Sequence, residues 1–314
     1  MKIVIALGGN ALARPEQEGT YDEQVANVRV VCRQLAEIIK NGHQVVVTHG
    51  NGPQVGNLAI QGGATKDVPE LPLHVLDAMT QGEIGYLIQR ELGNALEALG
   101  VKLSVASVVT QVLVDVKDPA FDSPSKPIGP FYDETRAKML AKEKGFVMKK
   151  VDRNPGRPYR RVVPSPDPVH VVEERVIAGM IREGYVVVAG GGGGIPVVKN
   201  SSGRYEGVDA VIDKDLCAEK IAEAVGADCL LILTNVEKLM AGYGTPKAKS
   251  LDSLTVKEAK RLLAQGEFPP GTMGPKVLAC LRFVEWRGGR GIIASLAGAV
   301  DALAGRSGTR ITPG

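Results

Sequence analysis

The sequence predicts an α/β fold built on a mainly parallel sheet. Three observations support this prediction. Short apolar runs rich in β-branched residues recur along the 314 residues of the chain. Longer segments with apolar residues at helical spacing alternate with them. Glycine-rich turns follow several of the apolar runs. Such an alternation of strand, turn and helix is typical of a mainly parallel sheet.

The chain before residue 110 alternates predicted strands with predicted helices. The apolar run Lys2–Leu7 predicts a buried strand. A helix is expected over Tyr21–Lys40, where apolar residues recur at helical spacing and Asn41-Gly42 follows as an end signal. The other elements expected before residue 110 are strand Gln44–Thr48, a helix opening near Pro53, helix Asp77–Leu99 and strand Leu103–Val109.

Residues 115–168 have a different composition. They hold nine of the 19 prolines, many charges and one clear helix, at about Asp133 to Lys144. We interpret them as an insertion that forms a small excursion or lid on the main sheet. A long irregular surface loop is the alternative interpretation.

The α/β pattern resumes after the insertion, without repeats or low-complexity segments. The elements expected there are helix His170–Arg182, strand Tyr185–Ala189, helix Val208–Val225, strand Cys229–Thr234, helix Thr255–Gln265, helix Met273–Trp286, strand Gly291–Ser295 and a final strand near Thr309–Thr312.

Composition restricts the class of protein. The chain is 44% hydrophobic and 23% charged, as in soluble globular proteins, and its net charge of +3 is too balanced to indicate a nucleic-acid or membrane partner. The histidines lack metal-ligand spacing, so no protein metal site is expected. No apolar run reaches about 18 residues, and no signal peptide is visible. We therefore expect the protein to be cytoplasmic. The cysteines are expected to be reduced core residues: Cys32, Cys217, Cys229 and Cys280.

Three glycine-rich turns carry the strongest functional signal. They are Leu7–Ala11, Thr48–Gly56 and Gly190–Gly194, and each follows an apolar run. Glycine lets a backbone come close to a ligand, and the N–H groups of such turns bind anions. Several phosphate or carboxylate groups held at once are what a phosphoryl-transfer enzyme needs. The chain lacks a P-loop and a GxGxxG fingerprint, so a dinucleotide site is not indicated.

Lysines beside glycine or aspartate add to this signal. Lys214 lies between Asp213 and Asp215, Lys276 begins the helix expected at Met273, and Lys126 lies inside the insertion. Lysine is a mobile point charge that suits phosphate oxygens. Phosphoryl transfer depends largely on positioning and on charge stabilisation, which such lysines provide.

These segments together resemble the carbamate kinases, within the amino acid kinase superfamily. The resemblance runs in order over nearly the whole chain. The matching segments are Ala6–Leu12, Thr48–Gly56, Ala78–Tyr86, Lys126–Pro130, Arg161–Pro166, Ala189–Pro196, Gly207–Asp215 and Gly271–Lys276.

The resemblance implies a three-layer αβα sandwich, one amino acid kinase domain over residues 1–314, and a homodimer. A carbamate and phosphoryl lobe would span 1–185, with a protruding subdomain at about 115–168, and a nucleotide lobe would span 186–314. The implied reaction is reversible, Mg²⁺-dependent phosphoryl transfer between carbamoyl phosphate and ADP. It gives ATP and carbamate, which decomposes to ammonia and carbon dioxide.

The resemblance also implies roles for individual residues. Lys126, Lys214 and Lys276 would neutralise charge on the transferring group, and Asp215 would orient Lys214 and Lys276. The implied substrate-binding residues are Gly8, Gly9, Asn10, Gly50, Asn51 and Gly52. The implied nucleotide-binding residues are Gly190, Gly191, Gly192, Lys214, Thr234, Asn235, Val236, Thr272, Met273 and Lys276. We expect His49 to be a loop histidine whose hydrogen bonds are made within the protein. We expect Glu83 to be a charged residue on the surface of a helix.

One position separates the subfamilies. Many amino acid kinases carry a lysine two residues before the first glycine pair, where this chain has Ala6. The carbamate kinases share this absence, and Lys126 is the matching source of charge. These two positions disfavour a kinase that acts on another acid or phosphate. A non-enzymatic sensor is also disfavoured, because the chain keeps Lys214 and Lys276. The direction of the reaction stays open.

Overall fold

The computed structural model describes the chain except residues 10–11, 13, 15, 66, 152–155 and 247. Eight strands form the main sheet, in the order β15-β17-β16-β12-β1-β2-β9-β3. They are β15 (Ser253–Thr255), β17 (Thr309–Thr312), β16 (Arg290–Ser295), β12 (Cys229–Thr234), β1 (Lys2–Leu7), β2 (Gln44–His49), β9 (Val186–Val188) and β3 (Val105–Ser107). Only the β16–β17 pair is antiparallel among these neighbours, so the predicted mainly parallel sheet is confirmed.

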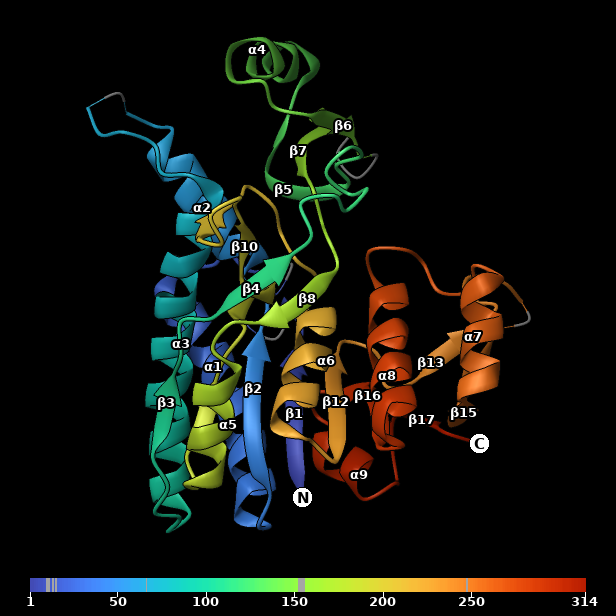
Figure 1. Cartoon of the computed structure of the whole chain (residues 1–314). Helices are drawn as coiled ribbons and strands as arrows, with labels where there is room; N and C mark the ends of the chain where they lie inside the picture. Colours follow the sequence, from blue (N-terminus) through green and yellow to red (C-terminus); the bar gives the residue numbers. More distant parts are fainter. Residues whose placement is uncertain (10–11, 13, 15, 66, 152–155, 247) are drawn as a thin grey trace.

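Helices cover both faces of this sheet and make three layers (Figure 1). Successive side chains of a strand point to opposite faces. Ile3, Ile5 and Leu7 accordingly join one core cluster, and Val4 and Ala6 join the other. The first cluster includes residues of α1 (Tyr21–Lys40), α3 (Leu73–Ala98) and α9 (Ala299–Leu303). The second includes residues of α5 (Glu174–Arg182), α6 (Lys214–Val225), α7 (Val256–Ala264) and α8 (Met273–Arg287).

A second sheet was not expected from the sequence. Its order is β11-β10-β4-β8. Its strands are β4 (Gln111–Val114), β8 (Pro168–Val171), β10 (Ile195–Lys199) and β11 (Tyr205–Gly207), and a further hairpin pairs β13 (Leu239–Ala241) with β14 (Lys249–Leu251). The helix expected from His170 is therefore wrong at its start, because β8 occupies that segment and α5 begins at Glu174.

The helix expected from Val208 also begins later, at Lys214. The carboxylate of Asp213 accepts a hydrogen bond from the backbone N–H of Asp215, 2.9 Å away, and so caps the helix. Ala210 and Ile212, just before the cap, are buried in irregular structure. The start of α6 is thus set by its capping carboxylate rather than by the apolar pattern.

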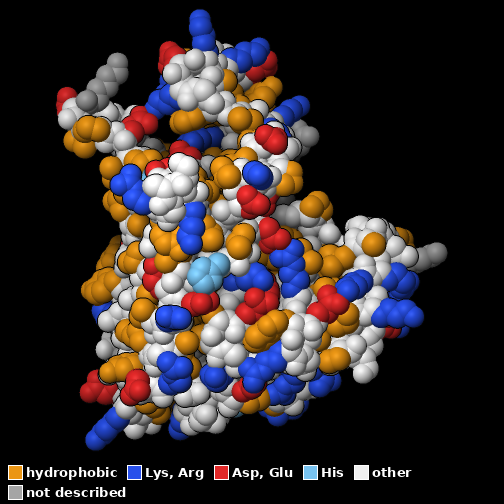
Figure 2. Space-filling view, in the orientation of Figure 1, with side chains coloured by type: hydrophobic (Ala, Val, Ile, Leu, Met, Phe, Trp, Pro, Cys, Tyr) orange, Lys and Arg blue, Asp and Glu red, His pale blue; other side chains and the backbone are white. Residues whose placement is uncertain are grey.

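The insertion is an ordered unit. β5 (Lys126–Tyr132), β7 (Tyr159–Val163) and β6 (Met148–Lys150) form an antiparallel sheet in this order, and α4 (Glu134–Lys144) lies beside them. Figure 1 shows this unit projecting from the body of the molecule. The predicted helix is confirmed, and the irregular loop is excluded for the described residues of this segment. Figure 2 shows basic and acidic side chains side by side on the body below the unit.

The root of the protruding unit is tied to α8. The backbone N–H of Asp167 donates to Asp118 Oδ2 at 2.9 Å, which joins the two connections of the unit. The guanidinium of Arg282 donates to both carboxylate oxygens of Asp167, at 2.7 and 2.6 Å. Such a two-pronged pair fixes orientation as well as distance. The unit is therefore anchored to the helix that carries Lys276.

The four cysteines are buried and unpaired, as predicted for core residues. Burial raises the pKa of the Cys217 and Cys229 thiols to about 12, so both thiols stay protonated at neutral pH. Within the described ranges, no helix combines the length and apolar character needed to cross a membrane.

Glu219 on α6 gives a prediction about stability and pH. Its side chain is fully buried, Oε2 has no hydrogen-bond partner among the described residues, and burial together with Glu223 raises its pKa to about 8. An unfolded glutamate titrates near 4.3. Between these values the folded state keeps a proton that the unfolded state releases, so stability falls as pH rises towards 8. Glu219→Gln should therefore raise the melting temperature at pH 8 and change it little at pH 5.

Thermal unfolding of wild type and variant from pH 5 to 9 measures this difference. Glu143→Gln, at an exposed position of α4, is the control and should run parallel to wild type. Parallel curves for Glu219→Gln as well would contradict the prediction.

Candidate active site

A cavity of about 870 Å³ opens at the carboxyl ends of the central strands. Gly8 follows β1, Gly50 follows β2, Thr234 ends β12 and Leu296 follows β16, and all four line the cavity. Residues 126–130 of β5 line it from the protruding unit. This edge is where ligands bind in open α/β sheets.

One buried carboxylate holds two lysines in the cavity. Lys276 Nζ donates to Asp215 Oδ2 at 2.7 Å, and Lys214 Nζ donates to Asp215 Oδ1. Lys214 and Asp215 lie in the first turn of α6, and Lys276 lies in the first turn of α8. Two helix N-termini, which favour anions, thus present lysines to the same space. The pairing of Asp215 with both lysines agrees with the sequence expectation.

The charges in this cluster are strongly coupled. Burial acts to raise the pKa of Asp215, but the two lysines outweigh it and hold that pKa at about 2. Burial also lowers the pKa of Lys276, and the attraction of Asp215 more than offsets it, so the pKa is raised. Burial and the neighbouring Lys276 hold the pKa of Lys214 below its usual range, despite Asp215. With both lysines protonated, the cluster carries one surplus positive charge, which suits a phosphoryl group.

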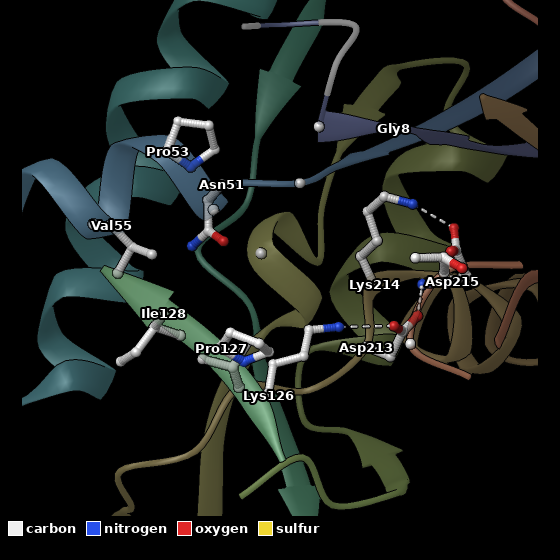
Figure 3. A pocket seen from close by; sticks show the side chains of 18 of the residues that line it. Gly8, Asn51, Pro53, Val55, Lys126, Pro127, Ile128, Asp213, Lys214 and Asp215 are labelled. Carbon is white, nitrogen blue, oxygen red and sulfur yellow. Dashed lines mark hydrogen bonds and ion pairs between the residues drawn. The ribbon is translucent and has the colours of Figure 1, made fainter. Parts of the chain in front are cut away.

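Lys126 reaches the same cavity from the protruding unit. Its Nζ donates to Asp213 Oδ2 at 3.0 Å, and Figure 3 shows the side chain extending towards Asp213 and Lys214. Ala6, the alternative place for a lysine, is fully buried between β2 and β12. A positive charge therefore enters the cavity from β5, and none enters it from position 6 of β1.

Glycine backbone borders the space between these lysines. Gly50 N donates to Leu7 O at 3.3 Å, and Gly8 N donates to Leu233 O at 3.0 Å. A Cβ on Gly50 would lie 3.4 Å from Gly9 and 3.5 Å from the side chain of Lys214. Gly9, Asn51 and Gly52 also line the cavity. Asn10 lies outside the described residues.

Comparison with known proteins identifies the family. The model of the amino acid kinase family matches residues 1–295. The carbamate kinase of Thermococcus kodakarensis is 53% identical over 99% of this chain and 98% of its own length, and that of Pyrococcus furiosus is 50% identical over 99% of both. The solved carbamate kinase from Giardia lamblia bound to AMP-PNP is 42% identical, with a TM-score of 0.93 over 99% of this chain and 98% of its own.

The chain belongs to the amino acid kinase family, among its carbamate kinases. It is therefore a kinase with the fold that the resemblance implied. The sandwich of three layers and the protruding unit agree with that fold.

The nucleotide positions expected for a carbamate kinase are only partly brought together. Thr234, Asn235, Thr272, Met273 and Gly192 line the cavity with Lys214 and Lys276. Val236, Gly190 and Gly191 are not among the residues that line it.

Gly190 and Gly191 lie in a buried polar network of this amino acid kinase. Thr48 Oγ1 donates to Gly190 O at 2.8 Å, and Gly190 N donates to Thr110 Oγ1 at 2.9 Å. Gln81 Nε2 donates to Gly191 O at 2.9 Å, and Gln81 Oε1 accepts from Thr110 N at 2.7 Å. No role of Gln81 or Thr110 is predicted from the sequence. The only signal for Gln81 was its place in the matching segment Ala78–Tyr86.

Glu83 lies on the surface of α3, as predicted, whereas His49 is the last residue of β2 and not part of the loop that follows. His49 is buried, burial lowers its pKa to about 4, and its Nδ1 lies 3.1 Å from Gly50 O. It is therefore a neutral histidine at the end of β2, with Nδ1 within hydrogen-bond distance of Gly50 O. Glu83 is exposed on α3, although partial burial raises its pKa.

The close packing of Gly191 predicts a loss of stability on substitution. A Cβ there would lie 2.4 Å from the buried ring of His49. We expect Gly191→Ala to lower the free energy of unfolding by about 1–3 kcal/mol, as overpacking does. Urea unfolding measures it. Gly82→Ala is the matched control, because Gly82 is an exposed residue of α3 with no atom within 4 Å of its Cβ position. Equal stability of the two variants would contradict the prediction.

Proposed function

We propose that this chain transfers a phosphoryl group reversibly between carbamoyl phosphate and ADP, giving ATP and carbamate, which decomposes to ammonia and carbon dioxide. The observation that carries the proposal is the placement of Lys126 on one side of the cavity and of Lys214, Asp215 and Lys276 on the other. The full-length relatives named carbamate kinases support the choice of substrate.

The chemistry needs charge stabilisation and little else. The bond from phosphorus to the carbamate oxygen breaks, and a bond from phosphorus to a terminal oxygen of ADP forms. Both acceptors, carbamate and ADP, are already anionic, so no general base is required. Lys126, Lys214 and Lys276 neutralise the charge that spreads over the transferring group. Asp215 keeps Lys214 and Lys276 in place.

The two substrates occupy opposite ends of the cavity in this proposal. The glycine turns at Gly8–Asn10 and Gly50–Gly52 hold the carbamate and the moving phosphoryl group. The N–H groups of Gly8 and Gly50 take no part in this, because they already donate to Leu233 O and Leu7 O. The 1–185 lobe supplies these turns, and the 186–314 lobe supplies the nucleotide contacts. Thr234, Asn235, Thr272 and Met273 border the nucleotide, a placement supported by the cavity lining and by the AMP-PNP named for the Giardia lamblia relative.

Magnesium enters this reaction with the nucleotide. In the part of the chain that the structure describes, no three His, Cys, Asp or Glu side chains gather into a metal site. Asp213 and Asp215, which line the cavity, are ion-paired with lysines. Mg²⁺ commonly keeps several waters and binds through substrate phosphates. The residues therefore fit Mg²⁺ held mainly by ADP or ATP phosphates, where it shields their charge.

ATP formation from carbamoyl phosphate and MgADP by the purified protein tests the function. We expect rapid turnover that depends on all three components. The reverse assay supplies ATP with carbamate, acetylglutamate, glutamate or UMP as acceptor. Phosphorylation of another acceptor, with no ATP formed from carbamoyl phosphate, would overturn the proposal and leave the fold assignment intact.

We also propose a cytoplasmic homodimer. The support is the family resemblance, the free buried cysteines, and the apolar side chains Met79 and Tyr86 exposed on α3. Analytical ultracentrifugation of the purified protein tests the dimer, and a monomer at micromolar concentration would contradict it.

A further inference from the structure

The side-chain amide of Asn51 is held by two acceptors at the edge of the cavity. Asn51 lies two residues after β2, at the N-cap position of α2 (Gly52–Gly62), and its side chain makes no capping hydrogen bond. Its Nδ2 donates to Asp77 Oδ1 at 2.9 Å and to Thr80 Oγ1 at 2.8 Å. Asp77 and Thr80 lie on α3, and both are buried.

The hydroxyl of Thr80 determines which way the amide faces. Thr80 Oγ1 lies 2.8 Å from the backbone oxygen of Asp77, which can only accept a hydrogen bond. The single hydroxyl proton is therefore used there, so Thr80 Oγ1 must accept from Asn51. The atom of Asn51 beside it must then be the NH₂ group. Asp77 Oδ1 lies beside the same NH₂ group, but burial raises the pKa of Asp77 to about 7, so the orientation of the amide is fixed by Thr80.

The amide oxygen of Asn51 consequently faces the cavity. In Figure 3 it lies on the side of Lys126 and Lys214, and the nitrogen lies on the far side. No described residue donates a hydrogen bond to this oxygen. The amide also lies closely over Gly192, where a Cβ would be 2.4 Å from Nδ2 and 2.9 Å from Oδ1. Backbone on one side and α3 on the other leave the amide little room to turn.

The acceptor oxygen of Asn51 is complementary to the amine group of carbamate, which other small carboxylates such as acetate lack. The nitrogen of carbamate shares its lone pair with the carboxylate, so it donates hydrogen bonds and does not accept them. Acetate has a methyl group at that place and cannot donate. A site built to pair with a substrate N–H discriminates strongly against analogues that lack it, because its polar atom is left unpaired.

We propose that Asn51 Oδ1 accepts a hydrogen bond from the carbamate amine, and that Asp77 and Thr80 are positioning residues that keep this oxygen towards the substrate. The selectivity for carbamoyl phosphate over acetyl phosphate then depends on two buried side chains that do not touch the substrate. This inference rests on the proposed function and extends it to the specificity of the same site.

The test compares kcat/KM for ATP formation from carbamoyl phosphate with that from acetyl phosphate, both with MgADP. Thr80→Val removes the acceptor and keeps the shape, and Thr80→Ser keeps the hydroxyl. We expect Thr80→Val to lower the carbamoyl-to-acetyl ratio at least fivefold, and Thr80→Val combined with Asp77→Leu to lower it further. Thr80→Ser should restore the ratio to near the wild-type value.

The outcomes separate the inference from the proposed function. If both substrates lose activity in parallel in Thr80→Val, the residue is only structural and the inference is overturned. Should the double variant fail to fold, the single variant and its serine counterpart still decide the question. A wild-type protein that makes no ATP from carbamoyl phosphate would refute the proposed function, and the inference with it. Normal wild-type turnover with an unchanged ratio in Thr80→Val would refute the inference alone.

Discussion

Methionine in place of Lys276 or Lys214 is expected to lower kcat for ATP formation roughly 10³-fold, a loss of the size found when a preorganised charge at a transition state is removed. Methionine keeps much of the volume and removes the charge. Asp215, buried between the two lysines, would be left with one partner. We therefore also expect a fall in melting temperature, because a buried carboxylate that loses a partner is destabilising.

The measurement is a coupled assay of ATP formation at saturating carbamoyl phosphate and MgADP, run below the melting temperature of each variant. Lys257→Met is the control, because Lys257 is an exposed residue of α7. Circular dichroism checks that the variants are folded at the assay temperature. A folded Lys276→Met or Lys214→Met variant within tenfold of wild-type kcat would remove that lysine from the proposed machinery.

The second large effect is expected from Lys126. We expect Lys126→Ala to lower kcat roughly 10²-fold, the order of magnitude lost when one stabilising group is removed, and to change KM for ADP by less than about threefold. The reason is its position, since Lys126 enters the cavity from β5 while the predicted nucleotide contacts come from the opposite lobe. Steady-state kinetics in both substrates separates the two parameters.

Lys149→Ala is the matched control, because Lys149 belongs to β6 of the same protruding unit and is exposed. It should behave like the wild type. If Lys126→Ala raised KM for ADP and left kcat unchanged, Lys126 would be a nucleotide-binding residue instead. Unchanged kinetics would show that the protruding unit contributes no charge to the reaction.

The elements with strong local signals were predictable from the sequence. β1, α1, β12 and β17 have the predicted bounds. For α1 the reason is visible in its first turn, where Thr20 and Glu23 form a reciprocal capping box ahead of a regular apolar stripe. The strands of the second sheet are only three to five residues long. Their stability comes from distant partners such as β4 and β10, and a local pattern does not encode that pairing.

For a similar reason, the positions of the charged residues of the candidate site could be predicted from the sequence, and the surroundings of the glycines could not. Lys214, Asp215 and Lys276 could be placed because each lies at a helix start that the sequence marks or approximates. We predict that Gly190 and Gly191 border the nucleotide, and their backbone also forms hydrogen bonds with Thr48, Thr110 and Gln81. A glycine run signals close approach to the backbone, and the approaching group can be another part of the chain as well as a ligand. The sequence contains no local signal that separates the two cases.

Asp213 uses its two carboxylate oxygens for two different tasks. Oδ1 accepts from the backbone N–H of Asp215 at the start of α6, and Oδ2 accepts from Lys126 of the protruding unit. A movement that draws Lys126 away leaves a full negative charge facing the first turn of α6, beside Lys214. The docking of the unit and the local electrostatics of the helix start therefore vary together. One carboxylate thus links two segments that lie 87 residues apart in the chain.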